Sequence, residues 1–377
     1  MYISKITQNH FRNLKTSDVK FDSGVTVIVG DNGQGKTNLL EAVYVLVKGF
    51  SFRTSKTAYL LNNKSSQCVI DGLIEIGNLK YNCQLNIEHS RRTIFLNGKK
   101  TAASQLPAVF PVVLFSPESL AAIKEGPDVR RRLVDELLII HDRRNALLLA
   151  DYQRCLKSRN RVFKDYCNEK IQKSEAWDVI NSLNGVYLPL AVKLTLARIQ
   201  ALRDMGADFK TSANHILNSK NVDISVEYLV SDQSALDWSE KDIYYATLNR
   251  LEELRNKEFE TEITLGVQHS NDIHFFFKKE YSRYYCSKGQ QKTLILAFKM
   301  AQIMYHYRVH QNYPLLLLDD VLSELDPERR SCLITFLKGL TAQIILTTTD
   351  LHFPMNFEKD RLTIYKISQG EVSCNGE

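Results

Sequence analysis

The sequence Gly30-Asp31-Asn32-Gly33-Gln34-Gly35-Lys36-Thr37 fits the pattern G-x-x-x-x-G-K-[ST]. In this pattern the glycines let successive backbone N–H groups close around phosphate oxygens, the lysine reaches the β- and γ-phosphates, and the threonine hydroxyl holds Mg²⁺. The stretch therefore predicts a nucleotide-binding loop. We include the next residue, Asn38, among the expected nucleotide contacts.

The flanks of this loop support the prediction. Residues 25–29 are β-branched throughout, which is typical of a buried strand. Residues 38–46 have the apolar density of a helix. The loop would thus lie at a helix N-terminus, where unpaired backbone amides and the helix dipole attract anions.

A second segment supplies the carboxylates that such a site needs. Residues 315–318 are four leucines, and Asp319 and Asp320 follow them directly. An apolar strand ending in acids is common by itself, but beside the loop it predicts that Asp319 holds Mg²⁺, directly or through water, beside Thr37. Asp320 would then orient or deprotonate the attacking water. Asp320 and Lys36 are the candidate catalytic residues, and ATP and Mg²⁺ the expected cofactors.

Composition limits the class of protein. The chain has 377 residues, long enough for two domains or for one domain with a large insertion. A hydrophobic content of 44% and a charged content of 24% are typical of a soluble globular protein. We find no apolar run of the roughly 18 residues that a membrane span needs, and no secretion signal at the N-terminus. We therefore expect a cytoplasmic protein without a membrane partner.

Two further counts carry less weight. The seven cysteines include no C-x-x-C pair, so we expect neither structural zinc nor a disulfide framework. A net charge of +6 would help an acidic partner such as nucleic acid to approach, although many soluble proteins carry as much.

Periodicity predicts an α/β architecture interrupted by helices. Strands are expected at residues 70–76, 81–87, 92–97, 222–230, 263–265, 273–277, 343–347 and 362–367, and helices over much of 117–209, 244–254 and 293–306. Residues 1–116 and 261–377 would form a discontinuous nucleotide-binding head with an antiparallel β layer. Residues 117–260 would form a mainly helical insertion lobe.

A third motif lies just before the helix expected at 293–306. It reads Ser287-Lys288-Gly289-Gln290-Gln291, which would place a hydroxyl and free amides at a helix N-terminus. Taken alone, this pattern is most often only the start of a helix. In this chain it is also a second anion site without a phosphate-binding loop of its own, so it invites a phosphate held by another molecule.

Together these motifs resemble the ABC-type ATPase heads, and specifically the RecF family. Residues 9–14, 115–118, 130–132 and 318–326 carry phrases similar to that family, and the resemblance covers nearly the whole chain. It implies a P-loop ATPase head of the ABC type with a helical inserted domain.

The resemblance also implies a function. RecF-like proteins are bacterial recombination mediators that bind ATP and DNA, dimerise around sandwiched nucleotides, and with RecO and RecR help to load RecA at single-stranded gaps. Ser287, Gly289 and Gln290 would then meet the γ-phosphate held by Lys36 of the other subunit. The remaining residues implied to bind nucleotide are Arg12 and Asn13 after the first strand and Asp326 in the D-loop position.

The chain departs from the wider ABC pattern at three places. Asp320 stands where many heads have Glu, as in RecF-like chains, and this shorter acid suggests slow turnover. Thr349 replaces a switch His, so no imidazole senses the γ-phosphate. The turn at 266–272 is one residue longer than in the family and lacks its Arg.

Cationic residues are the candidate DNA contacts. Arg154, Lys157, Arg161 and Lys164 recur at spacings of three and four, so they would form one stripe on a helix, with Arg159 close by. The alternative is an ordinary solvated helix face.

A second group of cations is Arg130, Arg131 and Arg132, which lie among acids and would either contact DNA or pair internally. The aromatic runs at 275–277 and 284–285 are expected to pack in the α/β core and not to stack on bases.

Other classes of function remain open at this point. A transporter-type ATPase subunit disagrees with the long sequence separation between Thr37 and Ser287. A chromosome-organising coiled-coil ATPase should carry long heptad repeats or a C-x-x-C hook, and this chain has neither. A nucleotide-binding module without hydrolysis would be separated from an enzyme by a phosphate-release assay.

Overall fold

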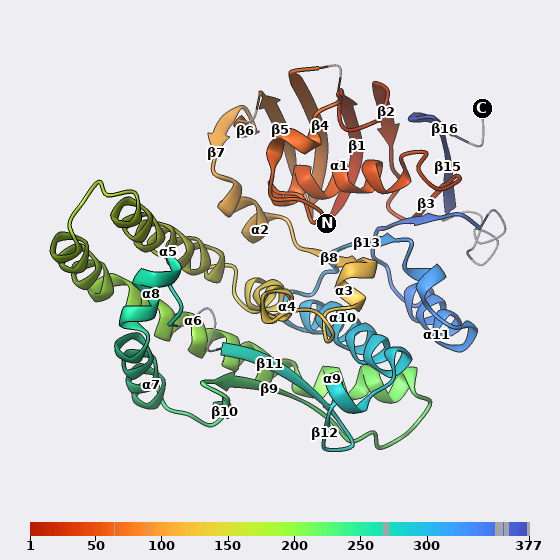
Figure 1. Cartoon of the computed structure of the whole chain (residues 1–377). Helices are drawn as coiled ribbons and strands as arrows, with labels where there is room; N and C mark the ends of the chain where they lie inside the picture. The colour runs from red at the N-terminus through yellow and green to blue at the C-terminus, as the bar shows by residue number, and fades with distance from the viewer. Residues whose placement is uncertain (64, 90, 267–270, 351–356, 358–361, 375–377) are drawn as a thin grey trace. The chain divides into compact units, whose positions relative to one another are not determined.

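The computed structural model describes the whole chain except residues 64, 90, 267–270, 351–356, 358–361 and 375–377 (Figure 1). The chain divides into two compact units, residues 1–120 with 299–377 and residues 121–298. The second unit therefore extends beyond the lobe end expected near residue 260.

The first unit contains two sheets. Its elements are β1 (Tyr2–Asn9), β2 (Ser17–Lys20), β3 (Val25–Val29), α1 (Lys36–Lys48), η1 (Thr57–Leu60), β4 (Gln67–Ile76), β5 (Leu79–Glu88), β6 (Arg91–Leu96), β7 (Lys99–Thr101), η2 (Ala103–Gln105), α2 (Leu106–Val109), β8 (Val112–Phe115), α3 (Pro117–Leu120), β13 (Leu315–Asp319), η3 (Val321–Glu324), α11 (Pro327–Lys338), β14 (Ile344–Thr348), β15 (Leu362–Ser368) and β16 (Glu371–Cys374). The strands expected at 25–29, 70–76, 81–87, 92–97, 315–318, 343–347 and 362–367 are confirmed.

One of these sheets has the order β16-β15-β3-β14-β13-β8, in which every pairing is parallel except that of β15 with β16. β3, β13 and β14 are buried at every residue, because parallel strands covered on both faces expose no polar side. The carboxyl ends of β3, β13 and β14 consequently meet at one edge of the sheet.

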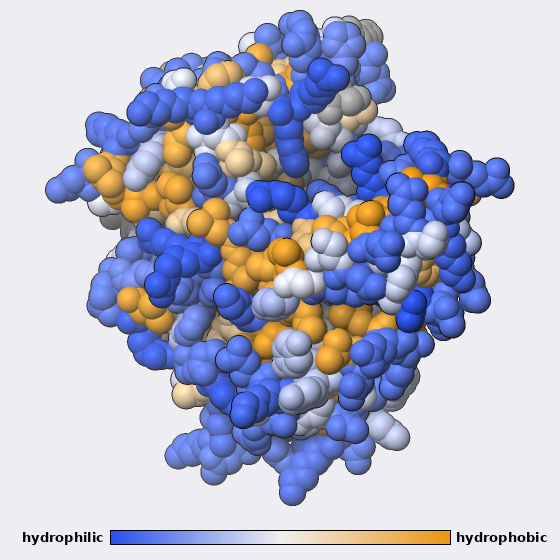
Figure 2. Space-filling model, turned by 90° about the vertical axis from the view of Figure 1, so that its left-hand side faces the viewer, coloured by the Kyte–Doolittle hydropathy of each residue, from blue (hydrophilic) through white to orange (hydrophobic). Residues whose placement is uncertain are grey.

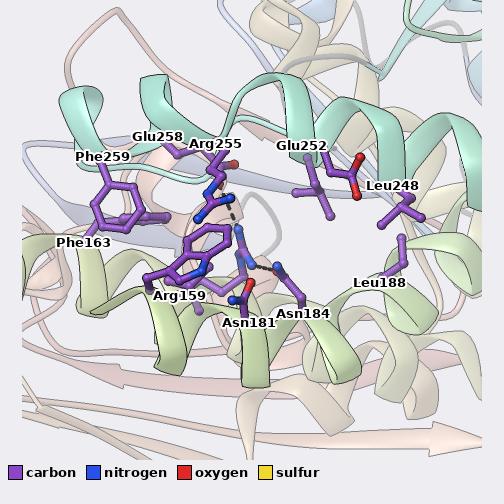
Figure 3. A pocket seen from close by; sticks show the side chains of 13 residues that line it. Arg159, Phe163, Asn181, Asn184, Leu188, Leu248, Glu252, Arg255, Glu258 and Phe259 are labelled. Carbon is purple, nitrogen blue, oxygen red and sulfur yellow. Dashed lines mark hydrogen bonds and ion pairs between the residues drawn. The ribbon is translucent and has the colours of Figure 1, made fainter. Parts of the chain in front are cut away.

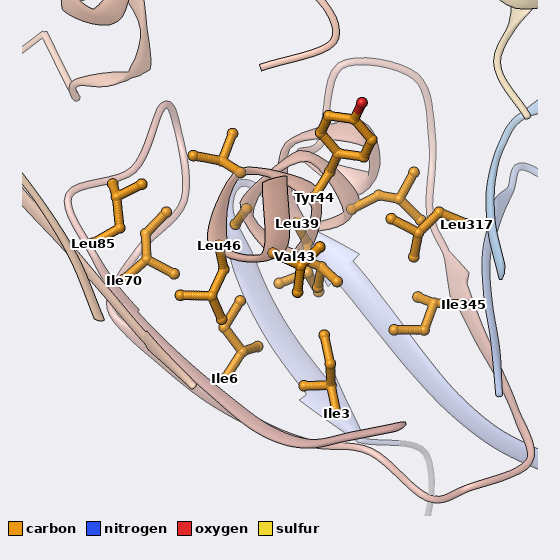
Figure 4. Packing of buried hydrophobic residues seen from close by; sticks show 14 of the residues in the cluster. Ile3, Ile6, Leu39, Val43, Tyr44, Leu46, Ile70, Leu85, Leu317 and Ile345 are labelled. Atoms are coloured by element: carbon orange, nitrogen blue, oxygen red, sulfur yellow. The ribbon is translucent and has the colours of Figure 1, made fainter. Parts of the chain in front are cut away.

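The other sheet is the expected antiparallel layer, with the order β2-β1-β4-β5-β6-β7. Helix α1 lies between the two sheets, as Figure 4 shows, where its side chains Leu39, Val43 and Leu46 meet apolar residues from both. Ile70 comes from the antiparallel layer and Ile345 from the parallel sheet, and both are fully buried. This core fixes α1, and thereby the loop that precedes it.

The second unit is mainly helical. Its elements are α4 (Pro127–His141), α5 (Asn145–Cys167), α6 (Lys173–Ile216), β9 (Ile224–Val230), β10 (Gln233–Ser234), α7 (Glu240–Glu253), α8 (Arg255–Thr261), β11 (Asn271–Phe277), β12 (Glu280–Tyr281), α9 (Ser282–Tyr285) and the first part of α10 (Lys288–His310). The strands expected at 222–230 and 273–277 and the helices expected at 244–254 and 293–306 are present.

A small sheet of order β10-β9-β11-β12 explains why this unit reaches residue 298. β11 pairs antiparallel with β9, so the segment after residue 260 belongs with the helices before it. Phe275 of β11 packs edge-on against Phe298 of α10, with ring centroids 5.5 Å apart. The first half of α10 is thereby tied to this unit.

The strand expected at residues 263–265 is wrong. The backbone N–H of Thr264 donates to the side chain of Asn160 (2.8 Å), and those of Leu265 and Gly266 donate to the Glu258 carboxylate (2.7 and 3.1 Å). Side chains therefore take the hydrogen bonds that a neighbouring strand would otherwise provide. Of the unusual turn at 266–272, residues 267–270 lie outside the described part of the chain.

Helix α6 is the one described helix long and apolar enough to cross a membrane by length and composition, and 39% of its most apolar window is buried. Its apolar side chains include the buried Leu188, Ala191 and Leu194, and the helix packs against α4, α5 and α7. Core packing therefore accounts for its composition. On the face drawn in Figure 2, hydrophilic side chains cover most of the surface, with apolar ones gathered in patches.

Candidate nucleotide-binding site

The loop at residues 30–37 connects β3 to α1, as the sequence predicts. Gly30 has no room for a side chain, because an added Cβ would lie 2.4 Å from the carbonyl oxygen of Ile367. Gly35 has a φ of +119°, which side chains rarely permit, and its backbone approaches Leu14 and Asn13. The glycines thus allow the tight turn, while Asp31, Asn32 and Gly33 are exposed at its tip.

Lys36 is directed back along the loop. Its Nζ donates to the carbonyl oxygens of Gly30 (2.7 Å) and Asp31 (2.9 Å), and the residue is only 6% exposed. Burial lowers the pKa of this amine, whereas the charges of Asp320, Asp31 and Asp319 oppose that shift. A buried cation held by two carbonyls among carboxylates is well placed to bind phosphate.

Asp319 is the carboxylate at the end of β13, and two hydroxyls donate to its Oδ1. The Oγ1 of Thr37 lies 2.7 Å away and the Oγ1 of Thr347 lies 2.9 Å away. Burial raises the pKa of Asp319, and both hydrogen bonds oppose this shift. Thr37 and Asp319 therefore meet as the sequence predicts.

These donors fit a magnesium ion. Mg²⁺ prefers hard oxygen ligands and is commonly held by one or two protein groups together with phosphate oxygens. Thr37 and Asp319 supply a hydroxyl and a buried carboxylate, and the latter is the kind of group whose charge a divalent cation would stabilise. Bound Mg²⁺ would supply charge neutralisation for the transferring phosphoryl group.

Thr347 is a site residue that sequence reasoning missed. It is opposite Asp319 in the parallel pairing of β13 with β14, so both side chains reach the same edge of the sheet. Its hydroxyl donates to Asp319 and accepts from the backbone N–H of Asp320 (2.9 Å). Asp320 itself has a φ of +47° and is partly exposed. The signal was available, because strands that are parallel neighbours end in register.

An ion network around the buried Glu41 of α1 links this helix to Arg12 and Arg53. Glu41 of α1 is fully buried and accepts from Arg12 at both carboxylate oxygens (2.8 and 3.0 Å). Arg53 donates to Glu41 (3.3 Å) and to Asn38 (2.8 Å). The expected phosphate contact Arg12 is thus bound to Glu41 in this structure, and Glu41 and Arg53 were not predicted. An acid within an otherwise apolar helix was the signal for them.

The turn between β15 and β16 closes on the loop from the other side. The backbone N–H groups of Gln369 and Gly370 donate to the side chain and the carbonyl oxygen of Gln34 (2.6 and 3.0 Å). Asn13 donates to the carbonyl oxygen of Gly33 (3.3 Å) and accepts from Asn38 (2.6 Å). Asn13 and Asn38 therefore lie beside the loop, and the turn between β15 and β16 holds Gln34 within it. Their contact with nucleotide stays a prediction.

The signature residues lie in the second unit. Ser287 precedes α10, where its Oγ accepts from the backbone N–H of Gln290 (3.3 Å) and the Gln290 side chain accepts from the backbone N–H of Ser287 (2.8 Å). This reciprocal pair is a capping box. Ser287 is exposed, and Gly289 and Gln290 are half-buried beside it in the first turn.

Asp326, the expected D-loop residue, caps α11. Its Oδ1 accepts from the backbone N–H of Arg329 (3.1 Å), and its other oxygen pairs with the Arg329 side chain. The backbone hydrogen bond from Arg329 lowers the pKa of Asp326, which is exposed. Thr349, at the switch position, is exposed just after β14.

Two of the candidate DNA contacts are engaged inside the second unit. Arg130 is 1% exposed, and its guanidinium binds both carboxylate oxygens of Asp272 at 2.8 Å. Arg131 is buried and pairs with Asp128. The structure therefore removes Arg130 and Arg131 from the candidate DNA surface and leaves Arg132 exposed.

The cationic stripe on α5 is exposed to solvent, as contact with DNA requires. Its four members face solvent: Arg154, Lys157, Arg161 and Lys164. Arg159 lies on the opposite, buried face of the helix with Phe163. Arg154 and Arg161 contact Asp151 and Asp165 of the same helix at 3.2 and 3.6 Å, contacts that are weak when solvent-exposed.

A cavity of about 470 Å³ opens beside that buried face (Figure 3). The Arg159 guanidinium lies between Glu258 (2.9 Å) and Asn184, to both of which it donates. Burial raises the pKa of Glu258, and the charge of Arg159 opposes the shift. Phe163 and Phe259 pack edge-on at 5.1 Å next to this pair. The arrangement joins α5, α6 and α8.

The fold and the site together define an ATPase head of the ABC type: a G-x-x-x-x-G-K-[ST] loop after the buried strand β3, a carboxylate at the end of β13, which is separated from β3 by β14, and an antiparallel layer across α1. The family model of the RecF/RecN/SMC N-terminal domain matches residues 2–373, and the chain belongs to this family.

Relatives agree over the full length. The chain is 32% identical to the DNA replication and repair protein RecF of Lactobacillus acidophilus over 380 residues, covering all of both chains. It is 31% identical to RecF of Bacillus cereus strain G9842, covering 99% of each.

Solved structures agree with the fold. A structure of the recombination mediator protein RecF with ATP is similar, with a TM-score of 0.84 and 28% identity over 99% of this chain and 97% of that one. An Smc head bound to the winged-helix domain of ScpA matches with a TM-score of 0.57 and 16% identity, covering 99% and 97%, which shows the fold alone.

Proposed function

We propose that this chain is a cytoplasmic, ATP-gated DNA-binding protein that acts as a recombination mediator in DNA repair and replication restart. The observation that carries the proposal is the meeting of Lys36, Thr37 and Asp319 at one edge of the parallel sheet. Support comes from full-length relatives that are named DNA replication and repair proteins, and from the similarity to a structure of RecF with ATP.

ATP would act by joining two copies of the chain. The loop motif occurs once in the sequence, whereas the signature at Ser287 and Gly289 belongs to the other compact unit. A phosphate reaching Ser287 from a second copy would be shared between two chains, and a two-fold symmetric pair would contain two such sites. Nucleotide affinity would then favour the dimer by mass action.

Hydrolysis would release the pair. Asp320 directly follows Asp319, the proposed Mg²⁺ ligand, and would orient or deprotonate a water. Its carboxylate is one methylene shorter than the glutamate of many ABC heads, which favours slow turnover. We therefore expect a weak ATPase whose principal role is to time the closed state on DNA.

Duplex DNA near a single-strand gap is the proposed ligand of the closed dimer. The exposed stripe on α5 offers four cations to backbone phosphates without reading bases. RecR and RecO, with RecA downstream, are the partners that the family resemblance implies.

Two substitutions test the dimer mechanism. Lys36→Arg should weaken nucleotide-dependent dimerisation, because the longer planar group cannot occupy the space between the Gly30 and Asp31 carbonyls. Gel filtration with ATP should show fewer dimers than the unmodified chain, and an unchanged dimer fraction would exclude the shared-nucleotide mechanism.

Asp320→Asn should leave binding intact and stop hydrolysis, so closed dimers accumulate with ATP. A phosphate-release assay with and without gapped DNA measures this directly. ATP turnover equal to that of the unmodified chain would remove Asp320 from its catalytic role, and no turnover by the unmodified chain would indicate a passive nucleotide-binding module.

A further inference from the structure

Two tyrosines ahead of the signature are the most exposed large apolar or aromatic side chains in the described chain. Tyr284 is 74% and Tyr285 is 71% exposed, at the end of the short helix α9. The sequence prediction that they pack in the core is wrong, whereas in the run at 275–277 Phe275 is buried. Side chains this exposed leave apolar area in water that a partner surface would cover.

The helix that carries these tyrosines is firmly held. Nε2 of the buried Gln291 donates to the carbonyl oxygens of Ser282 (2.9 Å) and Arg283 (3.1 Å). The rings of Tyr281 and Tyr284 meet edge-on, with centroids 5.4 Å apart. The ring of His274 stacks on that of Tyr281, with centroids 3.9 Å apart. The exposure of Tyr284 and Tyr285 is therefore a built feature of the surface.

We infer that Tyr284 and Tyr285 form a tyrosine platform that docks onto a second copy of this chain, next to the nucleotide held by Lys36 of that copy. The inference rests on the proposed ATP-gated dimer. Two residues of chain span at most about 7 Å, so a surface that brings a phosphate to Ser287 comes within reach of Tyr285, whose side chain is 71% exposed. The platform is thus continuous with the proposed signature contact.

Tyrosine chemistry suits this role. A tyrosine gives a large contact area, loses little rotamer freedom, and has a hydroxyl that tolerates water when the dimer is open. Because a two-fold pair contains each residue twice, every truncation removes two contacts. For two aromatic anchors we expect at least about a 100-fold weaker dimer, in the range seen for aromatic hot spots.

The test compares matched variants by analytical ultracentrifugation with ATPγS. Tyr284→Ser with Tyr285→Ser should weaken dimerisation about 100-fold, while the affinity of the monomer for a fluorescent ATP analogue stays unchanged. Tyr284→Phe with Tyr285→Phe should retain most of the dimer. The control is Tyr244→Ser with Tyr245→Ser, a second exposed tyrosine pair on α7 (39% and 60% exposed), which should dimerise normally.

The outcomes separate this inference from the proposed function. If Ser287→Arg abolishes the dimer but the platform variant dimerises like the unmodified chain, the platform inference is overturned and the shared-nucleotide dimer stands. If the unmodified chain forms no dimer with ATPγS, or Ser287→Arg has no effect, the proposed function fails first.

A cross-linking experiment identifies what covers the platform. The photoreactive residue p-benzoylphenylalanine at position 285 should link to a second copy of the chain. This linkage should require ATPγS and should not require DNA. Linkage to gapped DNA in place of protein would overturn the inference, since DNA would then be the occupant. Linkage to protein independent of nucleotide would overturn it equally.

Discussion

Asp319 illustrates how a site residue is kept at some cost in stability. Burial raises its pKa, so the folded chain holds the proton more tightly than the unfolded chain does. By linkage, stability falls as the pH rises from the ordinary carboxyl pKa to the raised pKa of the folded chain, and the cost is present in full above that raised pKa. A cation is what would offset this cost, which agrees with a magnesium role.

Asp319→Asn should therefore raise the Tm of the nucleotide-free protein by a few degrees at pH 7.5, because the amide oxygen can still accept from Thr37 and Thr347. The difference should shrink as the pH approaches about 4. Thermal unfolding with and without Mg²⁺ and ATP measures both, and the variant should lose the stabilisation by Mg²⁺ and ATP. A lower nucleotide-free Tm at pH 7.5 would contradict this account.

Thr347 is expected to hold the two acids in register. Thr347→Val leaves the N–H of Asp320 without its 2.9 Å acceptor, a loss of about 1–3 kcal/mol for a buried hydrogen bond. Phosphate release should fall at least about tenfold while nucleotide affinity changes less. Thr347→Ser retains the hydroxyl and should recover most of the rate, and a serine variant as slow as the valine one would argue against the hydroxyl's role.

The residues of the site were predictable to different degrees. Gly30 to Thr37 and Asp319 could be found because each motif fixes its own local geometry, and strand ends bring the two together. Thr347 and Glu41 left only partial signals in the sequence, a hydroxyl at the end of an apolar strand and an acid within an apolar helix. Their partners, and the role of Arg53, depend on which strands are neighbours and on which charges meet in the fold. Gln369 and Gly370 reach the loop only through the tertiary fold.

At the level of helices and strands, the elements with a continuous apolar run or a helical apolar period were predictable, because the pattern of buried residues along the sequence indicates the type of element. The segment at 263–265 has the residues of a strand, yet its amides bind Glu258 and Asn160. Likewise, only the pairing of β11 with β9 shows that the segment after residue 260 belongs to the helical unit. The conformation of residues 263–265 and the place of β11 in the helical unit thus both depend on contacts with residues distant in the sequence.

Arg159 connects helices α5, α6 and α8, and substitution of this residue tests the connection directly. Arg159→Ala would leave Glu258 buried without its cation, which costs about 3–5 kcal/mol of unfolding free energy. Urea unfolding followed by the fluorescence of Trp177, which lines the same cavity, measures this change. Arg161→Ala, on the exposed face of the same helix, should cost less than about 1 kcal/mol.

The comparison of Arg159→Ala with Arg161→Ala tests whether the buried pair of Arg159 and Glu258 joins α5 to α8. Arg159→Met with Glu258→Gln should recover part of the loss, because the unpaired buried charge is then gone. Equal losses for Arg159→Ala and Arg161→Ala would show that the buried pair does not join α5 to α8 as the structure implies.

For the whole molecule, the net charge is a weak indicator of DNA binding, whereas the distribution of the charges over the surface is more informative. The chain carries only +6, yet four cations line one exposed face of α5 while the opposite face is buried. Sequence spacing was sufficient to predict the stripe, because helical geometry fixes which residues share a face. It was not sufficient for Arg130 and Arg131, whose internal partner strand lies far along the chain.

Lys157→Gln with Lys164→Gln should weaken binding to duplex and gapped DNA without changing any sequence preference, because phosphate contacts position a protein but do not read bases. Each phosphate contact contributes about 0.9 to the slope of log affinity against log salt, so the slope should fall by about 1 to 2 units. Fluorescence anisotropy across a salt series, with ATP and Mg²⁺, measures this slope. Lys99→Gln with Lys100→Gln removes the same charge from the exposed strand β7 and should leave the slope unchanged. If both pairs change the slope equally, attraction by overall charge explains the binding, and α5 is not the DNA surface.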